Sequence, residues 1–411
     1  MSEIIEIRNA TVVTPNRCLD DGRVIVTGDR IAQVGSTPDS DLPRSRTIDA
    51  DGRLVMPGLI DLHGDDIEHH HSPRAGATVQ PRTALTTADR TNLLNGITTK
   101  FHAIAFEEAP DDGRSLATAA ALASEIGQAG YTLGDNRLHA RCELSDESVS
   151  AVAEVIDSAG VDLLSVMHHA PGDGQYDDES FERHYLEDRN WSADGVARLA
   201  RQRAAADPAV RDNRVERIVD LAARAGVPVA SHDDESPAAV DRMADHGVTI
   251  SEYPLTLDAI SRADARGLTT VMGAPNLLRG GSLWDNLAAD TAIEAGCVDV
   301  LCADYHPPSL LAAPFVDTGE SLPTRVNRVT RNPADAVGLT DRGRIEAGAR
   351  ADLLVVDPEP TPTVEQVFVG GESVARLEPT DTPEAEPPAA TQEYTPSLSS
   401  YPSPSAFHRR R

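Results

Sequence analysis

Hydrophobic positions in the middle of the chain fall into short continuous runs, and Ala-rich stretches with helical character separate these runs. Uninterrupted apolar runs predict strands buried on both faces, and their alternation with helices is typical of a parallel α/β fold. Eight such runs occur: LIDLH, TTKFHAI, LHARCEL, DLLSVMHH, VPVASH, TISEYP, TTVMGAP and VDVLCAD. Eight repeats predict a (β/α)8 TIM-like barrel, whose active site lies where the C-terminal ends of the strands meet.

The two ends of the chain have a different residue pattern from the middle. Residues 1–55 contain β-forming segments separated by Gly and Asp turns, and residues 345–377 repeat this pattern. We therefore predict that both regions pair into one small β-sandwich domain, and that residues 56–344 form the (β/α)8 barrel. Residues 378–411 are rich in Pro, Ser, Thr and Glu, a composition that predicts a disordered tail.

A long charged segment, residues 172–215, separates the fourth and fifth runs. It leaves the barrel on the side where the active site is expected. Two interpretations stay open, a lid or substrate arm and a solvated surface excursion.

The charge balance limits the partners of the chain. Asp and Glu number 66 against 37 Lys and Arg, giving a formal net charge of −29, and Lys100 is the only lysine. This excludes nucleic acid as an expected partner, argues against an anionic membrane surface, and is typical of halophilic proteins. The four cysteines form no C-x-x-C pair, and the N-terminus has no signal-peptide pattern. No apolar run approaches the length of about 18 residues that a membrane helix needs, so we expect a cytoplasmic protein.

Side chains that can bind a metal end several of the predicted strands. His63 and Asp65 end the first run, and the two-residue period of a strand points both toward one place. In the third run His139, Arg141 and Glu143 share one face. A buried carboxylate at Glu143 is costly unless it binds a metal or is paired, and Arg141 is the alternative partner.

The fourth, fifth and eighth runs supply the other candidates. His168 and His169 are adjacent and point to opposite sides, so we expect one of them, His169, to be the ligand. The predicted metal ligands are His63, Asp65, Glu143, His169, His232 and Asp304. Imidazole and carboxylate without thiolate suit one or two Zn²⁺ ions, with Mn²⁺ or Fe²⁺ as alternatives. The only lysine that could be considered as a bridge between two metals is Lys100, and it lies on the second strand. Glu143 is therefore the better candidate for that bridge.

The segment GAPNLLRGGS combines an Arg with a Gly-rich turn after the seventh run. Backbone N–H groups and a guanidinium can cradle a phosphate, although a tight turn between strand and helix is the alternative. The predicted substrate-binding residues are Asn276, Arg279, Gly280, Gly281, Ser282 and Arg74.

Several motifs resemble a known family. GRLVMPGLIDLH, RNPADAVGL and GRIEAGARADLLVVD resemble the amidohydrolase superfamily. Within it, LHARCEL, SVMHHAPG, VASHDD, VMGAPNLLRGGS and ADYHPPSLL resemble the diphosphatases that act on alpha-D-ribose 1-methylphosphonate 5-triphosphate in the carbon–phosphorus lyase pathway of phosphonate use. The resemblance spans residues 1–375. The H-x-D of His63 and Asp65 matches this family, whereas His168 stands where the family has Asp.

The resemblance implies a reaction and a substrate, a small phosphorylated sugar. It implies metal-assisted hydrolysis that releases diphosphate and leaves the 5-phosphate, with Asp304 and His232 as catalytic residues and Asp304 taking a proton from water. Cyclic amide hydrolysis or deamination at the same metal site is one alternative, and a non-catalytic scaffold is another. Homo-oligomerisation is left open by the sequence.

Overall fold

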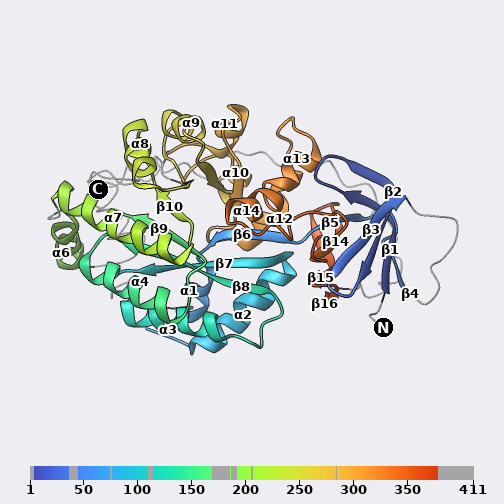
Figure 1. Ribbon diagram of the computed structural model, residues 1–411, viewed down its shortest axis with the longest axis horizontal. Coiled ribbons are helices and arrows are strands. Elements are labelled where there is room, and N and C mark those ends of the chain that lie inside the picture. The colour runs from blue at the N-terminus through green and yellow to red at the C-terminus, as the bar shows by residue number, and fades with distance from the viewer. Residues whose placement is uncertain are drawn as a thin grey trace, which may run out of the picture. The chain divides into compact units, whose positions relative to one another are not determined.

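Eight parallel strands form the centre of the fold (Figure 1). The computed structural model describes residues 4–36, 45–74, 76–109, 114–168, 186, 192–204, 207–283 and 285–377. The strands are β6 (Leu59–Gly64), β7 (Ile97–Phe106), β8 (Asp135–Glu143), β9 (Leu163–Met167), β10 (Val229–His232), β11 (Ile250–Glu252), β12 (Thr269–Gly273) and β13 (Val300–Cys302). Each pairs with the next along the chain, so the predicted (β/α)8 barrel is confirmed.

The barrel closes between its first and last strands. Gly64 and Asp304 form a parallel bridge across the seam. The N–H of Asp304 donates to the carbonyl of His63 at 2.8 Å, and the N–H of Asp65 donates to the carbonyl of Asp304 at 2.9 Å. Because these bonds involve three of the predicted metal ligands, closure of the barrel also sets their positions.

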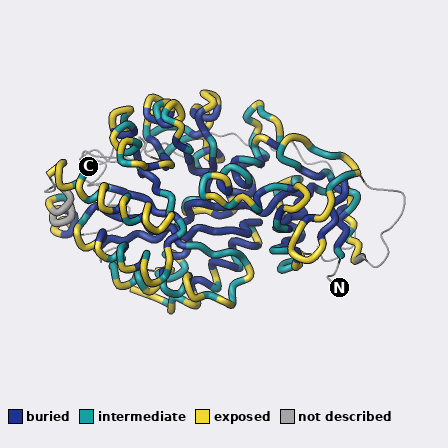
Figure 2. Tube along the Cα trace, viewed as in Figure 1, coloured by how far each residue is buried: buried dark blue, intermediate teal, exposed yellow. Residues whose placement is uncertain are grey.

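Helices cover the outside of the barrel, and Figure 2 shows buried strands inside a shell of more exposed helical faces. The helices are α1 (Asp66–His71), α2 (Pro81–Leu94), α3 (Leu116–Gln128), α4 (Asp146–Ser158), α6 (Ala193–Ala204), α7 (Pro208–Ala225), α8 (Pro237–His246), α9 (Leu257–Ala265), α10 (Ala274–Arg279), α11 (Ala289–Glu294), α12 (Pro307–Ala312), α13 (Leu322–Asn327) and α14 (Arg331–Ala336), with a 3-10 turn η3 (Ala313–Phe315). Ser115, Ser145 and Ser236 begin α3, α4 and α8 because each side chain accepts an N–H of the first turn. None of the described helices combines the length and hydropathy needed to cross a lipid bilayer.

Strands from both ends of the chain form a second, mixed sheet. They are β1 (Ile4–Val13), β2 (Cys18–Thr27), β3 (Arg30–Ser36), β4 (Ser45–Asp49), β5 (Leu54–Pro57), β14 (Leu353–Asp357), β15 (Thr363–Val369) and β16 (Glu372–Arg376). The two regions join where β5 pairs antiparallel with β14, with Val55 opposite Val355. Side chains from both regions, among them Ile7 and Phe368, share one core. The prediction that the two ends build one β-module is confirmed.

The ends of this sheet also touch each other. A Cβ at Gly371, in the turn after β15, would lie 2.1 Å from the carbonyl oxygen of Gly28, in the turn after β2. Since Gly371 also has a φ of +80°, only glycine fits there. The single sheet therefore curls around its core as a sandwich does.

The predicted domain boundaries stay predictions. Residues 1–376 form one compact unit, and β5 passes into β6 through the single residue Gly58. The predicted tail, residues 378–411, lies outside the described residues. Of the predicted insertion, the structure describes residue 186 and, from residue 192 on, parts of α6 and α7.

Candidate metal centre

Three buried side chains from separate strands meet inside the barrel, toward the C-terminal ends of its strands. They are His63 in β6, His139 in β8 and Glu252 at the end of β11. One ligand atom from each lies within 4.8 Å of the others. Because imidazole and carboxylate are the donors that catalytic zinc and related divalent ions use, this group could hold a metal.

The contact between His63 and Glu252 shows that a cation fits this group. His63 Nδ1 lies 3.4 Å from Glu252 Oε1, and neither buried atom makes a hydrogen bond within the described part of the chain. Burial, the largest single influence, lowers the pKa of His63, but the charge of Glu252 and the contacts with Asp65 and Glu252 together outweigh it, so the pKa of His63 rises to about 10. Burial would raise the pKa of Glu252, yet His139 and His63 hold that pKa well below its usual range. The site therefore favours a positive charge, which a divalent ion can supply in place of a proton.

The ring of His139 is fixed in one tautomer. Its Nδ1 lies 2.9 Å from the carbonyl oxygen of Leu62, which can only accept, so Nδ1 carries the proton. Its Nε2 lies 2.8 Å from Ser165 Oγ and 3.9 Å from Glu252 Oε1. The carbonyl thus directs the Nε2 lone pair toward the cluster, as outer contacts do for metal-binding histidines.

His232 packs against the same cluster. Its Nδ1 lies 3.4 Å from Glu252 Oε2, and its ring stacks on that of His63 with the centroids 5.4 Å apart. Tyr253 makes T-shaped contacts with both rings, at 5.1 Å from His63 and 5.2 Å from His232. The structure therefore brings the predicted ligand His232 to His63, and Tyr253 forms a wall beside them.

Asp65 connects His63 to a buried arginine. Asp65 Oδ1 lies 3.3 Å from His63 Nε2 and 3.1 Å from Arg141 Nη1. Burial would raise the pKa of Asp65, but the Arg141 guanidinium holds that pKa well below its usual range. Asp65 therefore stays a carboxylate, so it can ligate a cation or orient the imidazole of His63.

Asp304 reaches the cluster across the barrel seam. Burial, followed by repulsion from the Asp65 charge, raises the pKa of Asp304 to about 7. Asp304 has a positive φ of +55°. Two other residues that directly follow barrel strands also have a positive φ, Asp233 at +61° and Tyr253 at +53°. Left-handed backbone is strained for such residues and gathers at functional sites. Three examples at one barrel mouth support a functional centre there.

Glu143 and His168 form a separate pair of side chains at the ends of the adjacent strands β8 and β9. Glu143 Oε1, at the end of β8, lies 3.4 Å from His168 Nδ1, directly after β9. The other predicted ligand on this strand, His169, lies outside the described residues. Lys100 forms ion pairs with two aspartates, so its ammonium is already neutralised. Bridging by Glu143 and ligation by His169 stay predictions.

The predicted phosphate loop is the end of a short helix. The N–H groups of Gly280 and Gly281 donate to the carbonyl of Asn276 at 3.1 and 3.0 Å, so in this conformation they are not directed at an anion. The side chain of Asn276 is used to hold the following segment, through the carbonyl of Leu287 and the N–H of Ala289. Gly280 is the left-handed C-cap of α10, so the segment is a helix C-terminus and not the turn between strand and helix that was the alternative. The anion-binding role of these residues stays a prediction.

Three other predicted substrate-binding residues lie at the surface or near it. Arg279 is exposed and donates to the hydroxyl of Tyr305 at 2.9 Å and to the carbonyl of Gly281 at 2.7 Å. Ser282, directly after Gly281, is half-buried. Arg74 is exposed in the loop after α1. Their binding roles stay predictions.

Two residues of the cluster were not among the predicted ligands. Glu252 ends the run TISEYP just as His232 ends VPVASH, and this shared shape could have identified it. His139 was expected on the inward face of its strand, but its position four residues before Glu143 gave no sign that it reaches the cluster.

Comparisons with known sequences and structures identify several proteins that are similar to this chain. Residues 311–374 match the sequence model of the Amidohydrolase family. The alpha-D-ribose 1-methylphosphonate 5-triphosphate diphosphatase of Escherichia coli K12 is 32% identical over 360 residues, which cover 85% of this chain and 94% of that protein. A 5-methylthioadenosine/S-adenosylhomocysteine deaminase of Halobacterium salinarum is 26% identical over 402 residues, covering 89% of this chain and 88% of that protein. The crystal structure of A. niger ochratoxinase has a TM-score of 0.61 at 16% identity, covering 90% of this chain and 95% of that chain, which supports the fold alone.

Proposed function

The chain belongs to the amidohydrolase superfamily, and on that premise we propose that it hydrolyses alpha-D-ribose 1-methylphosphonate 5-triphosphate to the 5-phosphate and diphosphate. The observation that carries the proposal is the 32% identity to the Escherichia coli diphosphatase, because the match extends over 94% of that enzyme. At the position of Asp65, most members of the superfamily have a second histidine. This chain has the aspartate instead, as the diphosphatases that it resembles do.

The metal would be held by the buried cluster. His63, His139 and Glu252 supply imidazole and carboxylate donors, and Asp65, His232 and Asp304 lie around them. A divalent cation at such a site acts as a Lewis acid that polarises phosphoryl oxygens and acidifies water. Zn²⁺ is the ion we propose, with Mn²⁺ or Fe²⁺ as alternatives, because the donors include no thiolate.

The protein's own side chains position and move protons. Asp304 is half-buried, its charge interacts with those of Asp65 and His63, and its backbone is fixed by the seam, so its carboxylate can accept a proton from the attacking water. His232, whose ring stacks on that of His63, can donate a proton to the leaving diphosphate oxygen. Arg279 and Arg74 are exposed cations that can neutralise charge on the triphosphate.

Water exclusion follows from how the cluster is built. His63, His139 and Glu252 are each 0–1% exposed, and the ring of Tyr253 covers two of the histidines. Electrostatic interactions are stronger in such a dry site than in water, so charge developing on a phosphoryl oxygen is stabilised more effectively.

The test is phosphorus NMR of the ribose 1-methylphosphonate 5-triphosphate incubated with Zn- or Mn-loaded enzyme at high salt. We expect diphosphate and a 5-monophosphate to appear, and a chelator to abolish both signals. Stepwise release of single phosphates would move the point of attack. An unchanged spectrum from enzyme shown to contain metal would overturn the proposal and favour cyclic amide hydrolysis or deamination.

A further inference from the structure

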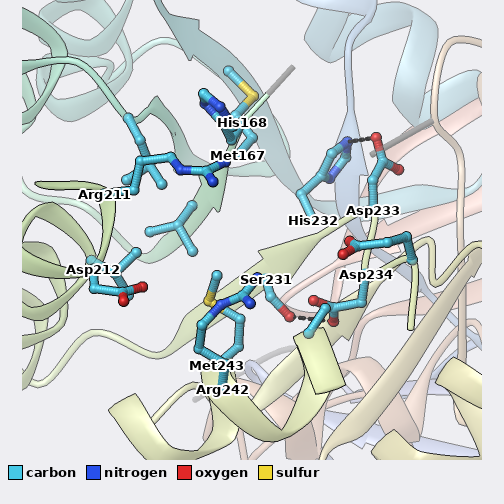
Figure 3. A pocket seen from close by; sticks show the side chains of 15 residues that line it. Met167, His168, Arg211, Asp212, Ser231, His232, Asp233, Asp234, Arg242 and Met243 are labelled. Atoms are coloured by element: carbon cyan, nitrogen blue, oxygen red, sulfur yellow. Dashed lines mark hydrogen bonds and ion pairs between the residues drawn. The ribbon is translucent and has the colours of Figure 1, made fainter. Parts of the chain in front are cut away.

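A pocket of about 110 Å³ adjoins the metal centre (Figure 3). His168 and His232, at the ends of β9 and β10, line it on the barrel side. Arg211 of α7 and Arg242 of α8 line it on the helical side, and Figure 3 shows the guanidinium of Arg211 directed toward His168. Because His232 also contacts Glu252, a ligand in this pocket would lie directly beside the metal cluster.

The free charge in this pocket belongs to Arg242. Within the described residues, Arg242 forms no ion pair or hydrogen bond, although it lies between two aspartates on α8. Those aspartates bind other arginines: Asp241 Oδ1 lies 2.7 Å from Arg262 Nη2, and Asp245 Oδ1 lies 2.6 Å from Arg266 Nη2. In a chain with a net charge of −29, an arginine that carboxylates leave unpaired is available for an anion from outside.

Two acidic residues of the pocket, Asp234 and Asp233, are bound to partners other than Arg242. Asp234 Oδ2 accepts hydrogen bonds from Ser231 and Ser251 at 2.6 and 2.7 Å, which holds this buried carboxylate at the barrel wall. Asp233 Oδ2 lies 3.7 Å from His232 Nε2, on the side of the metal centre. Asp212 and Glu235 complete the acidic lining.

We propose that the pocket between Arg211 and Arg242 is a subsite for a tetrahedral oxyanion group of the substrate that is not itself attacked. The proposal rests on the proposed function for the identity of the substrate, which carries such groups at both ends. Guanidinium groups suit this role because their planar N–H donors match two oxygens of a phosphoryl or phosphonyl group. The group is either the phosphonate on C1 or the terminal phosphate of the triphosphate.

Kinetics of Arg242→Met measure the contribution of the subsite. Since the subsite binds substrate and transition state alike, we expect KM to rise about tenfold while kcat stays within about twofold. Arg242→Lys should recover part of the loss, because it restores charge but not the planar donors. Arg224→Met is the matched control, since Arg224 is an exposed arginine of α7 that pairs only weakly with Asp220 at 3.9 Å.

Two substrates distinguish which group is bound. With ribose 5-triphosphate, which lacks the phosphonate, Arg242→Met should raise KM as before if the pocket binds the terminal phosphate. If the pocket binds the phosphonate, Arg242→Met should affect only the full substrate. An unchanged KM for both substrates, in a variant that is folded by circular dichroism, overturns the proposal.

A binding measurement separates this proposal from the assigned reaction. Calorimetric titration of the metal-loaded enzyme with inorganic diphosphate and with methylphosphonate needs no turnover. If the wild type hydrolyses neither substrate but binds one of these probes about tenfold more tightly than Arg242→Met does, the subsite stands and the assigned reaction fails. Equal affinities in the wild type and the variant overturn the subsite even if the enzyme proves to be a diphosphatase.

Discussion

The Nζ atom of Lys100 lies 2.6 Å from Oδ2 of Asp61, and both side chains are buried. The same ammonium lies 2.9 Å from Oδ1 of Asp66. The other oxygen of Asp61 accepts the N–H of His63 at 3.2 Å and the N–H of Ala303 at 2.9 Å. The only lysine of the chain therefore holds the carboxylate that connects the first barrel strand to the last.

Replacing Lys100 by Met should destabilise the fold strongly. Met fills much of the same space but leaves Asp61 and Asp66 as buried carboxylates without a cation. We expect the free energy of unfolding to fall by about 3–5 kcal/mol in urea titrations. Arg224→Met removes an exposed i,i+4 ion pair and should change it by less than about 0.5 kcal/mol.

The same variant should reverse a pH dependence. In the wild type, burial acts to raise the pKa of Asp66, but Lys100 lowers it below its usual value, so this carboxylate stabilises the fold at neutral pH and less as pH falls through the folded pKa. In Lys100→Met the lysine no longer opposes burial, the largest influence on this pKa, and only His102 and the hydrogen bond from Asn92 still lower it. We expect burial to prevail and to place the folded pKa above the unfolded one, so the variant should recover stability between about pH 7.5 and pH 5. A melting temperature difference that widens at pH 5 would contradict this account.

Gly64 should tolerate no side chain. A Cβ there would lie 1.8 Å from Lys100 Nζ and 2.7 Å from Asp61 Oδ2, in a position where neither partner can move without breaking the ion pair. We expect Gly64→Ala to lose at least about 1–3 kcal/mol of unfolding free energy. Gly35→Ala is the control, because nothing lies within 4 Å of its Cβ position, and it should melt like the wild type.

Metal content should depend on Glu252. Glu252→Gln keeps the shape but removes the charge that faces His63 and His139, so we expect bound zinc per chain to fall by more than half in emission spectrometry. Glu372→Gln, at an exposed position of β16, should bind as the wild type does. Full metal content in folded Glu252→Gln would place the ion elsewhere, with Glu143 and the histidines after β9 as the next candidates.

Asp304 should matter for turnover more than for metal binding. Asp304→Asn retains the backbone bonds of the seam, which use only the main-chain N–H and carbonyl of this residue. We expect kcat to fall by about 10²–10⁴, the usual contribution of a general base, with metal still bound. Retained turnover would remove Asp304 from the proposed role.

Salt should stabilise the protein. With 66 acidic against 37 basic residues, repulsion across the surface opposes the compact state, and ions screen it. We expect the melting temperature to rise between about 0.1 M and 3 M KCl, because the screening length shortens to a few ångströms. A melting temperature that is already maximal at low salt would argue against a salt-adapted protein.

The fold could be predicted because each barrel strand leaves a clear local mark. Runs such as VPVASH and VDVLCAD are mostly apolar and end at a polar residue, a pattern typical of strands buried on both faces. Alternation also placed His139, Arg141 and Glu143 on one face of their strand. The structure has His139 facing Glu252, and Cys142, between Arg141 and Glu143, lies in the outer core. Both conclusions depend on neighbours in sequence, which is where sequence patterns are informative.

The exact membership of the site could not be predicted in this way. Whether His139 or Glu143 reaches the cluster depends on how far β8 is shifted against β6 and β11, and that stagger is set by packing. The pairing of Lys100 with Asp61 joins positions 39 residues apart and leaves no local mark. At Gly280 and Gly281 the sequence did not distinguish a phosphate loop from the end of α10 that the structure contains, and the anion-binding role stays a prediction.

The seam between β6 and β13 has a consequence for synthesis. Asp61 and Ala303, which meet there, are 242 residues apart in the chain. A nascent chain cannot close the barrel, or bring Asp304 to His63, until all residues up to Asp304 have left the ribosome. Contacts between such distant segments form late in folding. Products that end before Asp304 and early folding intermediates should therefore be inert, and the appearance of activity would report that the seam has closed.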